Sequence, residues 1–562
     1  MCGILGANFQ HKNFLDSLHS LQHRGQDNSN VKIVNNNSFG HNRLAIIDLD
    51  NEANQPMSFN DITITFNGEI YNYKELIQSE KLICKTKSDT EVIIRLYEKY
   101  GQNFLHLLNG MFSFCIYDRK KEKYFCARDR FGKKPFYYYH KNNKFIYASE
   151  IKAILKLLDK QPDFNQDVLH EYLMFWSTIS QETFFKDIYK LKAGESLTFE
   201  NNILKTDNYY DLASKNSDFD YDNEKELLED IEDSLIESVQ LRLVGDQEVA
   251  SLLSGGIDSS IISAIYSKLS NKKINTFCIG YDQYDNYNEL KYANIVAKDI
   301  KSNHHELIIN KNIFTDSLEC ILQNLDEPIA DSAMVPTYII SKEIASQNIK
   351  VALTGEGSDE IFLGYDRYFQ RLKENDTSTI MINQAFSNIQ LNSLLTYPHK
   401  DIEYKMFQQS NLSTLQQFTY NDFNTWIAEN LMGKLDRMSM LNTLELRAPF
   451  LDYNLVEKVF KIDDSTKSGN NSKYLLKQIA LKYLPESIVN RRKKGFSSPS
   501  VEWLYEVYKN DILDTIIYVN KETNFFNSNE IILIFNNMKD GKNKQQLWSI
   551  YIFCRWFKKE FL

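Results

Sequence analysis

The sequence predicts two fold classes in one chain: an α+β sandwich of stacked antiparallel sheets flanked by helices, then an α/β domain with a parallel sheet and a helical C-terminal part. Short segments of alternating apolar and polar residues dominate the first third of the chain. A polar stretch follows, and beyond it compact apolar runs alternate with helical stretches. The chain of 562 residues is also too long for one hydrophobic core.

The antiparallel sheets are predicted from alternating segments that are separated by turn residues. These segments are residues 62–66, 111–117, 124–127 and 136–139. Residues 14–21 and 89–100 carry apolar side chains three and four positions apart. We expect these two segments to form helices that pack on the sheets.

The domain organisation is predicted from a change in composition. Between residues 205 and 229 the chain is rich in Asn, Asp, Ser and Glu without periodic apolar content, as in an interdomain linker. We therefore expect a first domain at 2–205, a linker at 206–229 and a second domain at 230–562. In the second domain, four apolar runs have the length of buried parallel strands. These runs are residues 249–253, 274–279, 306–309 and 351–354.

Composition and charge argue against several classes of protein. The net charge of −10 at pH 7 repels nucleic-acid phosphates and acidic membrane surfaces. The seven cysteines stand singly, without the spacing of a disulfide framework or a zinc site, which favours the reducing cytoplasm. There is no signal-peptide pattern and no apolar window of membrane-spanning length. We expect a cytoplasmic protein that acts on small molecules, with no nucleic-acid or membrane partner.

The first candidate site lies at the start of the chain. Removal of Met1 would leave Cys2 with a free α-amine and a thiol on the same residue. Reference pKa values of about 8.5 for the thiol and about 7.7 to 8.0 for the amine let the amine accept the thiol proton near neutral pH. Cys2 is thus a candidate nucleophile with its own base, although a cysteine at this position also occurs by chance.

Four downstream motifs give Cys2 more weight. They are His23-Arg24-Gly25, Arg43-Leu44-Ala45-Ile46-Ile47-Asp48, Asn67-Gly68-Glu69-Ile70-Tyr71-Asn72 and Ser88-Asp89-Thr90-Glu91. In order and approximate spacing they resemble the glutaminase domain of the class II, or N-terminal-nucleophile, glutamine amidotransferases. The resemblance implies the sandwich fold of that family. Gln26 stands where the family usually has proline, but this is a loop position.

The resemblance also implies how glutamine is held. Arg43 would bind the α-carboxylate, because a planar guanidinium gives two parallel hydrogen bonds, and Glu69 and Asp89 would bind the α-ammonium. The Asn67 side chain and the Gly68 backbone N–H would bind glutamine and stabilise the negative charge of the tetrahedral intermediate. Without the other motifs, Asn67-Gly68 would indicate an ordinary hairpin turn.

The second candidate site is the string Ser254-Gly255-Gly256-Ile257-Asp258-Ser259-Ser260, between an apolar run and a helical stretch. A strand, a glycine turn and a helix N-terminus form an anion site, because unpaired N–H groups converge there. Phosphate would repel Asp258 unless a divalent cation stood between them, which suggests Mg²⁺. The string lacks the Walker pattern and resembles the loop of the ATP pyrophosphatases, rather than a plain helix cap. The resemblance implies that Ser254, Gly255, Gly256, Asp258 and Ser259 bind ATP.

A second string, Thr354-Gly355-Glu356-Gly357-Ser358-Asp359-Glu360, follows the run 351–354. By resemblance, the backbones of Thr354 and Gly355 lie near the nucleotide, and Asp359 joins Asp258 at magnesium. Glu356 would assist deprotonation of the incoming ammonium or of the tetrahedral adduct. The same resemblance places Leu252 and Ile279 around the adenine. Thr354 is a mild departure, since the family more often has serine.

A basic run near the C-terminus, Arg491-Arg492-Lys493-Lys494-Gly495-Phe496, indicates an exposed loop when taken alone. By resemblance, Lys493 reaches the pyrophosphate at the transition state, with Lys494 as the alternative match. Residues 326–328 and 446–452 also match the family and are expected to shape the pocket.

Both halves in this order resemble the glutamine-hydrolysing asparagine synthetase family over nearly the whole chain. The resemblance implies that Cys2 releases ammonia from glutamine and that ATP adenylates aspartate, which ammonia then converts to asparagine. Since free ammonia would be protonated in bulk water, we expect a sheltered passage between the sites. A homodimer is common in the family and remains open for this chain.

Three alternatives remain open from the sequence. The same chemistry could act on another carboxylate, such as a uronic acid or a peptide-like acid, because the acceptor pocket is the part least defined by motifs. An RNA-modifying pyrophosphatase is disfavoured by the acidic charge and by the glutaminase half. A binding protein with inactive sites is disfavoured by the intact nucleophile and loops.

Overall fold

The computed structural model describes residues 1–215, 221, 223–374, 385–399, 409–469, 471–492, 495 and 498–562. Its first part contains two six-stranded sheets in which all neighbouring strands are antiparallel. The first sheet has the order β10-β8-β9-β1-β3-β2, and its strands are β1 (Gly3–Ala7), β2 (Asn28–Val34), β3 (Asn37–Arg43), β8 (Tyr137–Lys141), β9 (Lys144–Ala148) and β10 (Ile188–Lys190). The second has the order β12-β11-β7-β6-β5-β4, and its strands are β4 (Met57–Phe59), β5 (Ile62–Ile70), β6 (Gly110–Asp118), β7 (Lys123–Arg128), β11 (Glu195–Glu200) and β12 (Ile203–Asn208).

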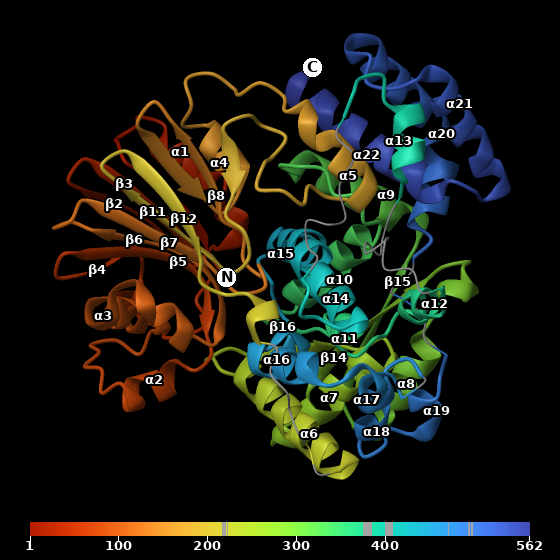
Figure 1. The fold of residues 1–562 in the computed structure, drawn as a ribbon, viewed down its shortest axis with the longest axis horizontal. Helices are drawn as coiled ribbons and strands as arrows, with labels where there is room; N and C mark the ends of the chain where they lie inside the picture. The colour runs from red at the N-terminus through yellow and green to blue at the C-terminus, as the bar shows by residue number, and fades with distance from the viewer. Residues whose placement is uncertain are drawn as a thin grey trace.

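The two sheets stack face to face, and helices cover them (Figure 1). An aromatic core lies between the sheets, because Phe39 on β3 packs against Tyr117 on β6 and Tyr124 on β7. The helices of this part are α1 (Phe14–His19), α2 (Tyr73–Ser79), α3 (Asp89–Tyr100), α4 (Ile151–Leu155) and α5 (Leu169–Phe175). The predicted sandwich is therefore confirmed, including the two predicted helices as α1 and α3.

The second part is built on a five-stranded parallel sheet with the order β15-β14-β13-β16-β17. Its strands are β13 (Val249–Leu252), β14 (Asn275–Tyr281), β15 (Asn303–Ile309), β16 (Val351–Leu353) and β17 (Glu445–Arg447). The first four coincide with the predicted apolar runs, which confirms the α/β assignment. The short strand β17 was not predicted.

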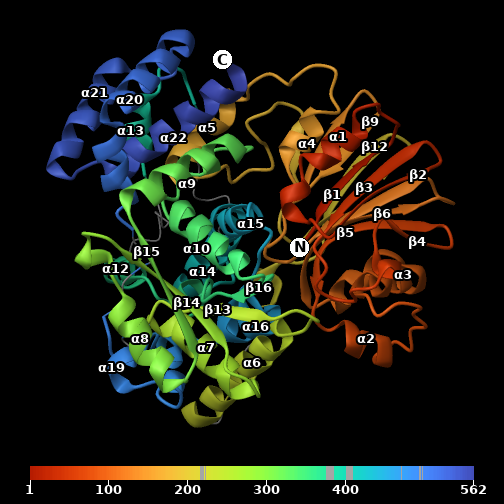
Figure 2. The ribbon, with the colours of Figure 1, turned by 180° about the vertical axis from the view of Figure 1, so that it is seen from behind.

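Helices surround this sheet and make up most of the C-terminal part (Figures 1 and 2). Those before residue 400 are α6 (Glu224–Arg242), α7 (Ile257–Leu269), α8 (Leu290–Asp299), α9 (Lys311–Asn324), α10 (Met334–Ser346), α11 (Ser358–Ile361), α12 (Asp366–Glu374) and α13 (Asn388–Leu394). Those after it are α14 (Thr414–Asp422), the π-helix η8 (Phe423–Leu431), α15 (Met432–Met440), α16 (Tyr453–Lys461), α17 (Asp464–Ser468), α18 (Tyr474–Ala480), α19 (Glu486–Val489), α20 (Ser500–Thr523), α21 (Ser528–Asn537) and α22 (Lys544–Phe561).

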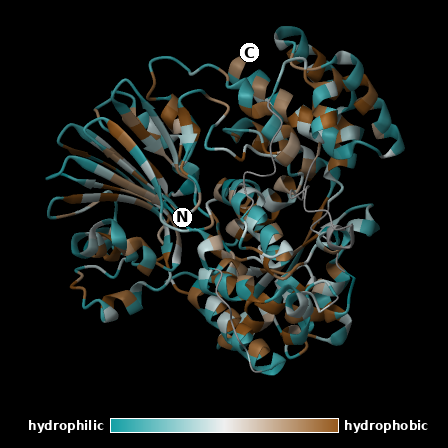
Figure 3. Cartoon of the chain, in the orientation of Figure 1, coloured by the Kyte–Doolittle hydropathy of each residue, from teal (hydrophilic) through white to brown (hydrophobic). Residues whose placement is uncertain are grey.

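The hydropathy of the elements agrees with this layered arrangement. Hydrophobic and hydrophilic residues alternate along the strands of the sandwich, and the helices around the parallel sheet carry both kinds, as amphipathic helices do (Figure 3). In the part of the chain that the structure describes, no helix has the length and apolar character needed to cross a membrane.

Candidate active sites

Cys2 lies where the two sheets of the sandwich meet. It immediately precedes β1 of the first sheet, and its backbone N–H donates to Asn67 Oδ1, on β5 of the second sheet, at 2.9 Å. The side chain of Cys2 is 7% exposed, and burial raises the pKa of its thiol. Because the charge of the chain's amino group acts in the opposite direction, an amine at this position favours the thiolate.

Asn67 and Gly68 lie inside strand β5 and not in a hairpin turn, so the ordinary interpretation of this pair is wrong. Gly68 has φ of +151°, and a Cβ at this position would lie 2.0 Å from the Met111 carbonyl oxygen on β6. Only glycine fits such a position. Asn67 is fully buried and bonded to the Cys2 backbone. The adjacent Gly68, whose N–H is the predicted backbone donor, is therefore held near Cys2.

The predicted glutamine-binding residues lie around the same point. The Arg43 guanidinium donates to two neutral acceptors, the Asp50 carbonyl at 3.0 Å and Asn54 Oδ1 at 2.8 Å. These bonds fix its position, but neither acceptor neutralises its charge. Asp89 Oδ2 accepts from the Ile70 N–H at 3.0 Å. Burial raises the pKa of Asp89 to about 6.

Glu69 is held by a residue from the other half of the chain. Arg447 Nη2, on β17, lies 3.7 Å from Glu69 Oε1, and the second oxygen of Glu69 is buried without a partner among the described residues. Burial, with Glu445 and Asp89 nearby, raises the pKa of Glu69 well above its usual value. A cation arriving at this carboxylate would therefore relieve an unfavourable burial.

A buried layer of charges joins Cys2 to the second half. Arg24 Nε donates to the Cys2 carbonyl at 3.1 Å, and the same guanidinium pairs with Glu150 at 2.9 Å and Asp436 at 2.8 Å. The amino group of Met1 pairs with Glu445 at 3.1 Å, and both residues are at most 1% exposed. Met1 therefore fills space between the two halves next to Cys2.

The second site lies at the carboxyl ends of β13 and β16. The loop after β13 leads into α7, and Gly255 in it has φ of +74°, with Ala293 N only 2.4 Å from where a Cβ would lie. The Ser254 and Ser259 hydroxyls lie 3.0 Å apart and close the loop. A Cβ on Gly355 would lie 2.8 Å from Ser259 N, so the two predicted strings pack directly on each other.

Asp258 and Asp359 converge on one side chain that the sequence interpretation missed. Lys473 Nζ forms ion pairs with both carboxylates, at 2.5 Å to Asp359. Lys473 is 2% exposed and lies at the N-terminus of α18. Although burial acts to lower the pKa of Lys473, the two aspartates raise it above its usual value, so the side chain stays a cation.

Glu356 lies beside these groups, among further charged side chains. Burial raises its pKa to about 7, with Lys434 acting against the shift and Glu360 and Asp331 adding to it. Lys434 itself pairs with Asp331 at 2.7 Å. A carboxyl group with a pKa near neutrality is suited to proton transfer.

A cavity of about 400 Å³ opens between these residues. Of the residues predicted to bind ATP or magnesium or to assist in the reaction, those lining it are Leu252, Ser254, Gly256, Asp258, Ser259, Ile279, Thr354, Gly355, Glu356 and Asp359. Gly255 does not line it. Lys493 and its alternative Lys494 lie outside the described residues, whereas Arg491 in the same run donates to the Gly255 carbonyl at 3.2 Å and pairs with Glu289.

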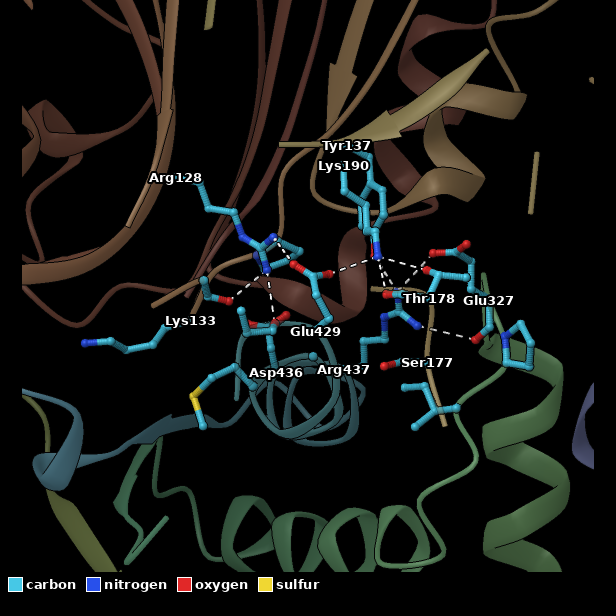
Figure 4. Close-up of a pocket in the computed structure, with 17 residues that line it drawn as sticks. Arg128, Lys133, Tyr137, Ser177, Thr178, Lys190, Glu327, Glu429, Asp436 and Arg437 are labelled. Atoms are coloured by element: carbon cyan, nitrogen blue, oxygen red, sulfur yellow. Dashed lines mark hydrogen bonds and ion pairs between the residues drawn. The ribbon is translucent and has the colours of Figure 1, made fainter. Parts of the chain in front are cut away.

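Between the sites, charged side chains from both halves surround a small cavity of about 30 Å³ (Figure 4). Glu429 lies between Arg128 and Lys190 and pairs with each at 3.0 Å. Although burial acts to raise the pKa of Glu429, the two cations hold it below its usual value. Asp436 also lines this cavity. Because Asp436 pairs with Arg24, the cavity is connected to the residues beside Cys2.

The sequence held little signal for several of these residues. Lys473 follows Asp359 by more than a hundred positions and belongs to no motif that was recognised. Arg447 lies in residues 446–452, which were expected only to shape a pocket. Asp436 and Glu429 belong to a helical stretch where charged residues usually face solvent.

A candidate nucleophile on an antiparallel sandwich, joined to a candidate phosphate-binding loop on a parallel sheet, indicates the class of glutamine-dependent amidotransferases. Comparison with known proteins agrees with this class. The asparagine synthase family matches residues 230–558, and the glutamine amidotransferase domain matches residues 1–210. The chain belongs to the asparagine synthase family and carries an N-terminal glutamine amidotransferase domain.

Individual relatives extend over most of the chain. It is 28% identical to asparagine synthetase [glutamine-hydrolyzing] 1 of Bacillus subtilis, over 99% of this chain and 96% of that protein. It is 36% identical to a putative asparagine synthetase of Methanocaldococcus jannaschii, over 65% of this chain and 76% of that protein. It is also 27% identical to the amidase chyE of Penicillium rubens, over 88% of this chain and 87% of that protein.

Proposed function

We propose that this chain makes an amide from a carboxylate, with ammonia taken from glutamine and with energy from ATP. The observation that carries the proposal is the presence of two separate constellations, one around Cys2 and one around the paired loops 254–260 and 354–360. Breaking one amide and forming another are opposite reactions. Two sites in one chain allow both to run without reversing each other.

At the first site, the Cys2 thiolate attacks the carboxamide carbon of glutamine, ammonia leaves, and water cleaves the thioester to glutamate. Removal of Met1 frees the Cys2 amine. The nitrogen of this group already donates a hydrogen bond to Asn67 Oδ1. Arg43 binds the α-carboxylate, and Asp89 and Glu69 bind the α-ammonium. The Gly68 N–H and the Asn67 side chain stabilise the charge of the tetrahedral intermediate.

At the second site, the acceptor carboxylate attacks the α-phosphorus of ATP and pyrophosphate leaves. Ammonia then attacks the acyl carbon, and AMP leaves. The loop 254–260 and the N-terminus of α7 hold phosphate oxygens, and the Lys473 ammonium compensates the charge that develops on them. Glu356 accepts the proton that the attacking nitrogen loses.

Asp258 and Asp359 are the residues that would hold a magnesium ion. Their carboxylates converge on one cation in the structure, and hard oxygen donors of this kind fit magnesium. When bound, magnesium would compensate the negative charge of the phosphates. Glutamine and ATP use follow from the family, whereas magnesium is part of this proposal.

The small cavity between the halves supports a sheltered passage for ammonia. Its volume of about 30 Å³ accommodates one molecule of this size, and Gly433 on α15 has no atom within 4 Å of where a Cβ would lie. The same helix carries Asp436, which pairs with Arg24 beside Cys2, and Lys434, which acts on Glu356. We infer that the route runs along α15.

The acceptor that the sequence resemblance implies is aspartate, and the names of two of the relatives above support it. In that case the intermediate is β-aspartyl-AMP, and the products are asparagine, glutamate, AMP and pyrophosphate. The second candidate is the same chemistry on another carboxylate, such as a uronic acid, which the aromatic residues of the second cavity favour. The division into 2–205, 206–229 and 230–562, a homodimer and a cytoplasmic location stay predictions.

The test is product analysis with purified full-length protein. Incubation with an acceptor acid, ATP, magnesium and glutamine labelled with ¹⁵N at the amide is expected to give glutamate and AMP in equal amounts. Mass spectrometry then shows which acceptor carries the label. A protein that lacks Met1, is folded, and forms neither glutamate nor AMP with any acceptor would refute the proposal.

A further inference from the structure

Three of the aromatic side chains that line the cavity of about 400 Å³ come from segments outside β14 and the loop after it, and they have no role in the mechanism above. They are Trp176, Tyr365 and Trp426. Trp176 directly follows α5, Tyr365 lies between α11 and α12, and Trp426 lies on η8. The residues proposed for ATP come instead from the ends of the strands and the loops after them. The rings therefore belong to the helical cover of the cavity, where an acceptor would lie.

Glu360 anchors two of these rings close to the reacting groups. Trp426 Nε1 donates to Glu360 Oε1 at 3.2 Å, and the Tyr365 hydroxyl donates to the same oxygen at 2.8 Å. Glu360 is 1% exposed, and its charge acts on Glu356. The rings are thus fixed beside the carboxylate that we propose accepts a proton during amide formation.

Three local features around the rings are rare in proteins. Trp176 has φ of +69°, a left-handed conformation that bulky residues rarely adopt, and its buried indole N–H has no partner among the described residues. Its ring meets that of Trp426 edge to face, with centroids 5.5 Å apart. Trp426 lies on a π-helix of nine residues, a rare conformation found mostly at functional sites. Such features persist where function requires them.

Several charged groups at the cavity are held by neighbouring side chains. Among the described residues that line it, Lys434 is the only one with a cationic side chain, and Asp331 is its partner at 2.7 Å. The Arg367 guanidinium lies against the Tyr365 ring, 3.8 Å from its centre. Carboxylates such as Asp331 accept hydrogen bonds from hydroxyl groups, and the faces of aromatic rings attract the electropositive C–H groups of a sugar ring.

We propose that the acceptor is a sugar acid, a hexuronic acid whose ring packs against Trp176 and Trp426 with its carboxylate toward the nucleotide. This inference rests on the proposed function. A carboxylate oxygen of the sugar acid forms a bond to the α-phosphorus of ATP, and pyrophosphate leaves. Ammonia then forms the C–N bond, AMP leaves with the oxygen of the acyl phosphate, and Glu356 takes the proton. The product is a hexuronamide.

The first test is a panel of acids with the full-length protein, ATP, magnesium and glutamine. D-glucuronate, D-galacturonate and their UDP-linked forms are compared with aspartate and glutamate for AMP and amide formation. At least one uronate is expected to give AMP at a rate roughly ten times that of aspartate or more. AMP formation with aspartate alone overturns the inference and leaves the proposed function intact. No AMP with any acid overturns both.

The second test uses variants of the aromatic wall. Trp426→Leu is expected to raise KM for the uronate about tenfold, and Trp426→Phe, which keeps a ring, about threefold. KM for ATP and the rate of glutamine hydrolysis stay unchanged, which shows that the protein is folded. Tyr518→Leu, at an exposed aromatic on α20, is the control and leaves all three unchanged. A Trp426→Leu variant with an unaltered KM for the uronate overturns the inference.

Discussion

The Arg447 guanidinium on the parallel sheet lies 3.7 Å from the Glu69 carboxylate in the proposed glutamine pocket of the sandwich. The same residue accepts a hydrogen bond from the Thr354 N–H at 2.9 Å through its backbone oxygen. Its side chain also pairs with Glu445 at 2.6 Å, and Glu445 in turn holds the amino group of Met1. One residue thus contacts both candidate sites.

Loss of the Arg447 charge is expected to destabilise the protein. Arg447→Met leaves Glu69 and Glu445 buried without their cation and should lower the free energy of unfolding by about 3–5 kcal/mol. Arg447→Lys restores the charge without the planar fork and should recover part of that loss, while KM for glutamine stays raised. Denaturant unfolding and glutaminase assays measure the two effects. Equal stability of the Met variant and the unaltered protein would contradict the ion-pair assignment.

Lys473 is expected to be needed for AMP formation and not for glutamine hydrolysis. Lys473→Met removes the cation that joins Asp258 and Asp359, so the synthetic rate should fall by about a hundredfold or more. AMP is measured by chromatography with ammonium chloride as nitrogen source. Lys477→Met, one turn further along α18, is the matched control and should keep full activity. Asp258→Asn should show the same loss as Lys473→Met, with glutaminase activity intact.

Cys2→Ala is expected to abolish glutamine use and to leave ammonia-driven synthesis unchanged. The substitution removes the thiol, while the backbone bond to Asn67 and the loops of the second site stay in place. Glutamate release and AMP formation are assayed separately, with glutamine and with ammonium chloride. Loss of both activities together would argue against two independent sites.

Glu356→Gln is expected to abolish synthesis and to stabilise the protein at high pH. Burial raises the pKa of Glu356 from 4.5 to about 7, so the folded state binds the proton more tightly than the unfolded chain. The resulting stability is complete below pH 4.5 and is lost as the pH rises to about 7. The Gln variant does not lose this stability as the pH rises. Its free energy of unfolding should exceed that of the unaltered protein by about 1–3 kcal/mol at pH 8 and by almost nothing at pH 4.5.

Thermal unfolding at pH 4.5 and pH 8 checks this prediction. Glu522→Gln, at an exposed glutamate on α20, is the control and should show the same Tm as the unaltered protein at both values. An equal Tm for Glu356→Gln and the unaltered protein at pH 8 would show that the Glu356 carboxylate carries no burial penalty.

Much of the fold could be predicted because periodicity and local motifs carry it. The alternating segments around residues 62–66 and 111–117 became β5 and β6, and the run 249–253 became β13. The strand β17 was missed because it has only three residues, and its pairing with β16 depends on contacts across the sheet. Asn67-Gly68 illustrates the limit of local rules, since a pair typical of turns lies within a strand.

The candidate sites were predictable where the chemistry lies in a continuous string. The loops 254–260 and 354–360 pack together as their family resemblance implied, and most of their predicted residues line one cavity. Lys473, Trp176 and Trp426 could not be found, because they come from distant helical segments. Lys473 joins the two aspartates, and the two tryptophans line the cavity. A lysine or tryptophan outside a motif has the same local pattern whether it lies in a core or in a site.

The ion pairs that cross between the halves limit how the chain can be recombined. Glu429 and Asp436 each neutralise a cation contributed by the first 210 residues, and Arg447 lies beside Glu69 of that part. A chimera that takes its glutaminase part from a relative would bury whichever of these carboxylates lost its counterpart. A chimera should therefore fold more often when the segment 429–447 is taken from the same relative as the N-terminal part, even though the two are far apart in the sequence.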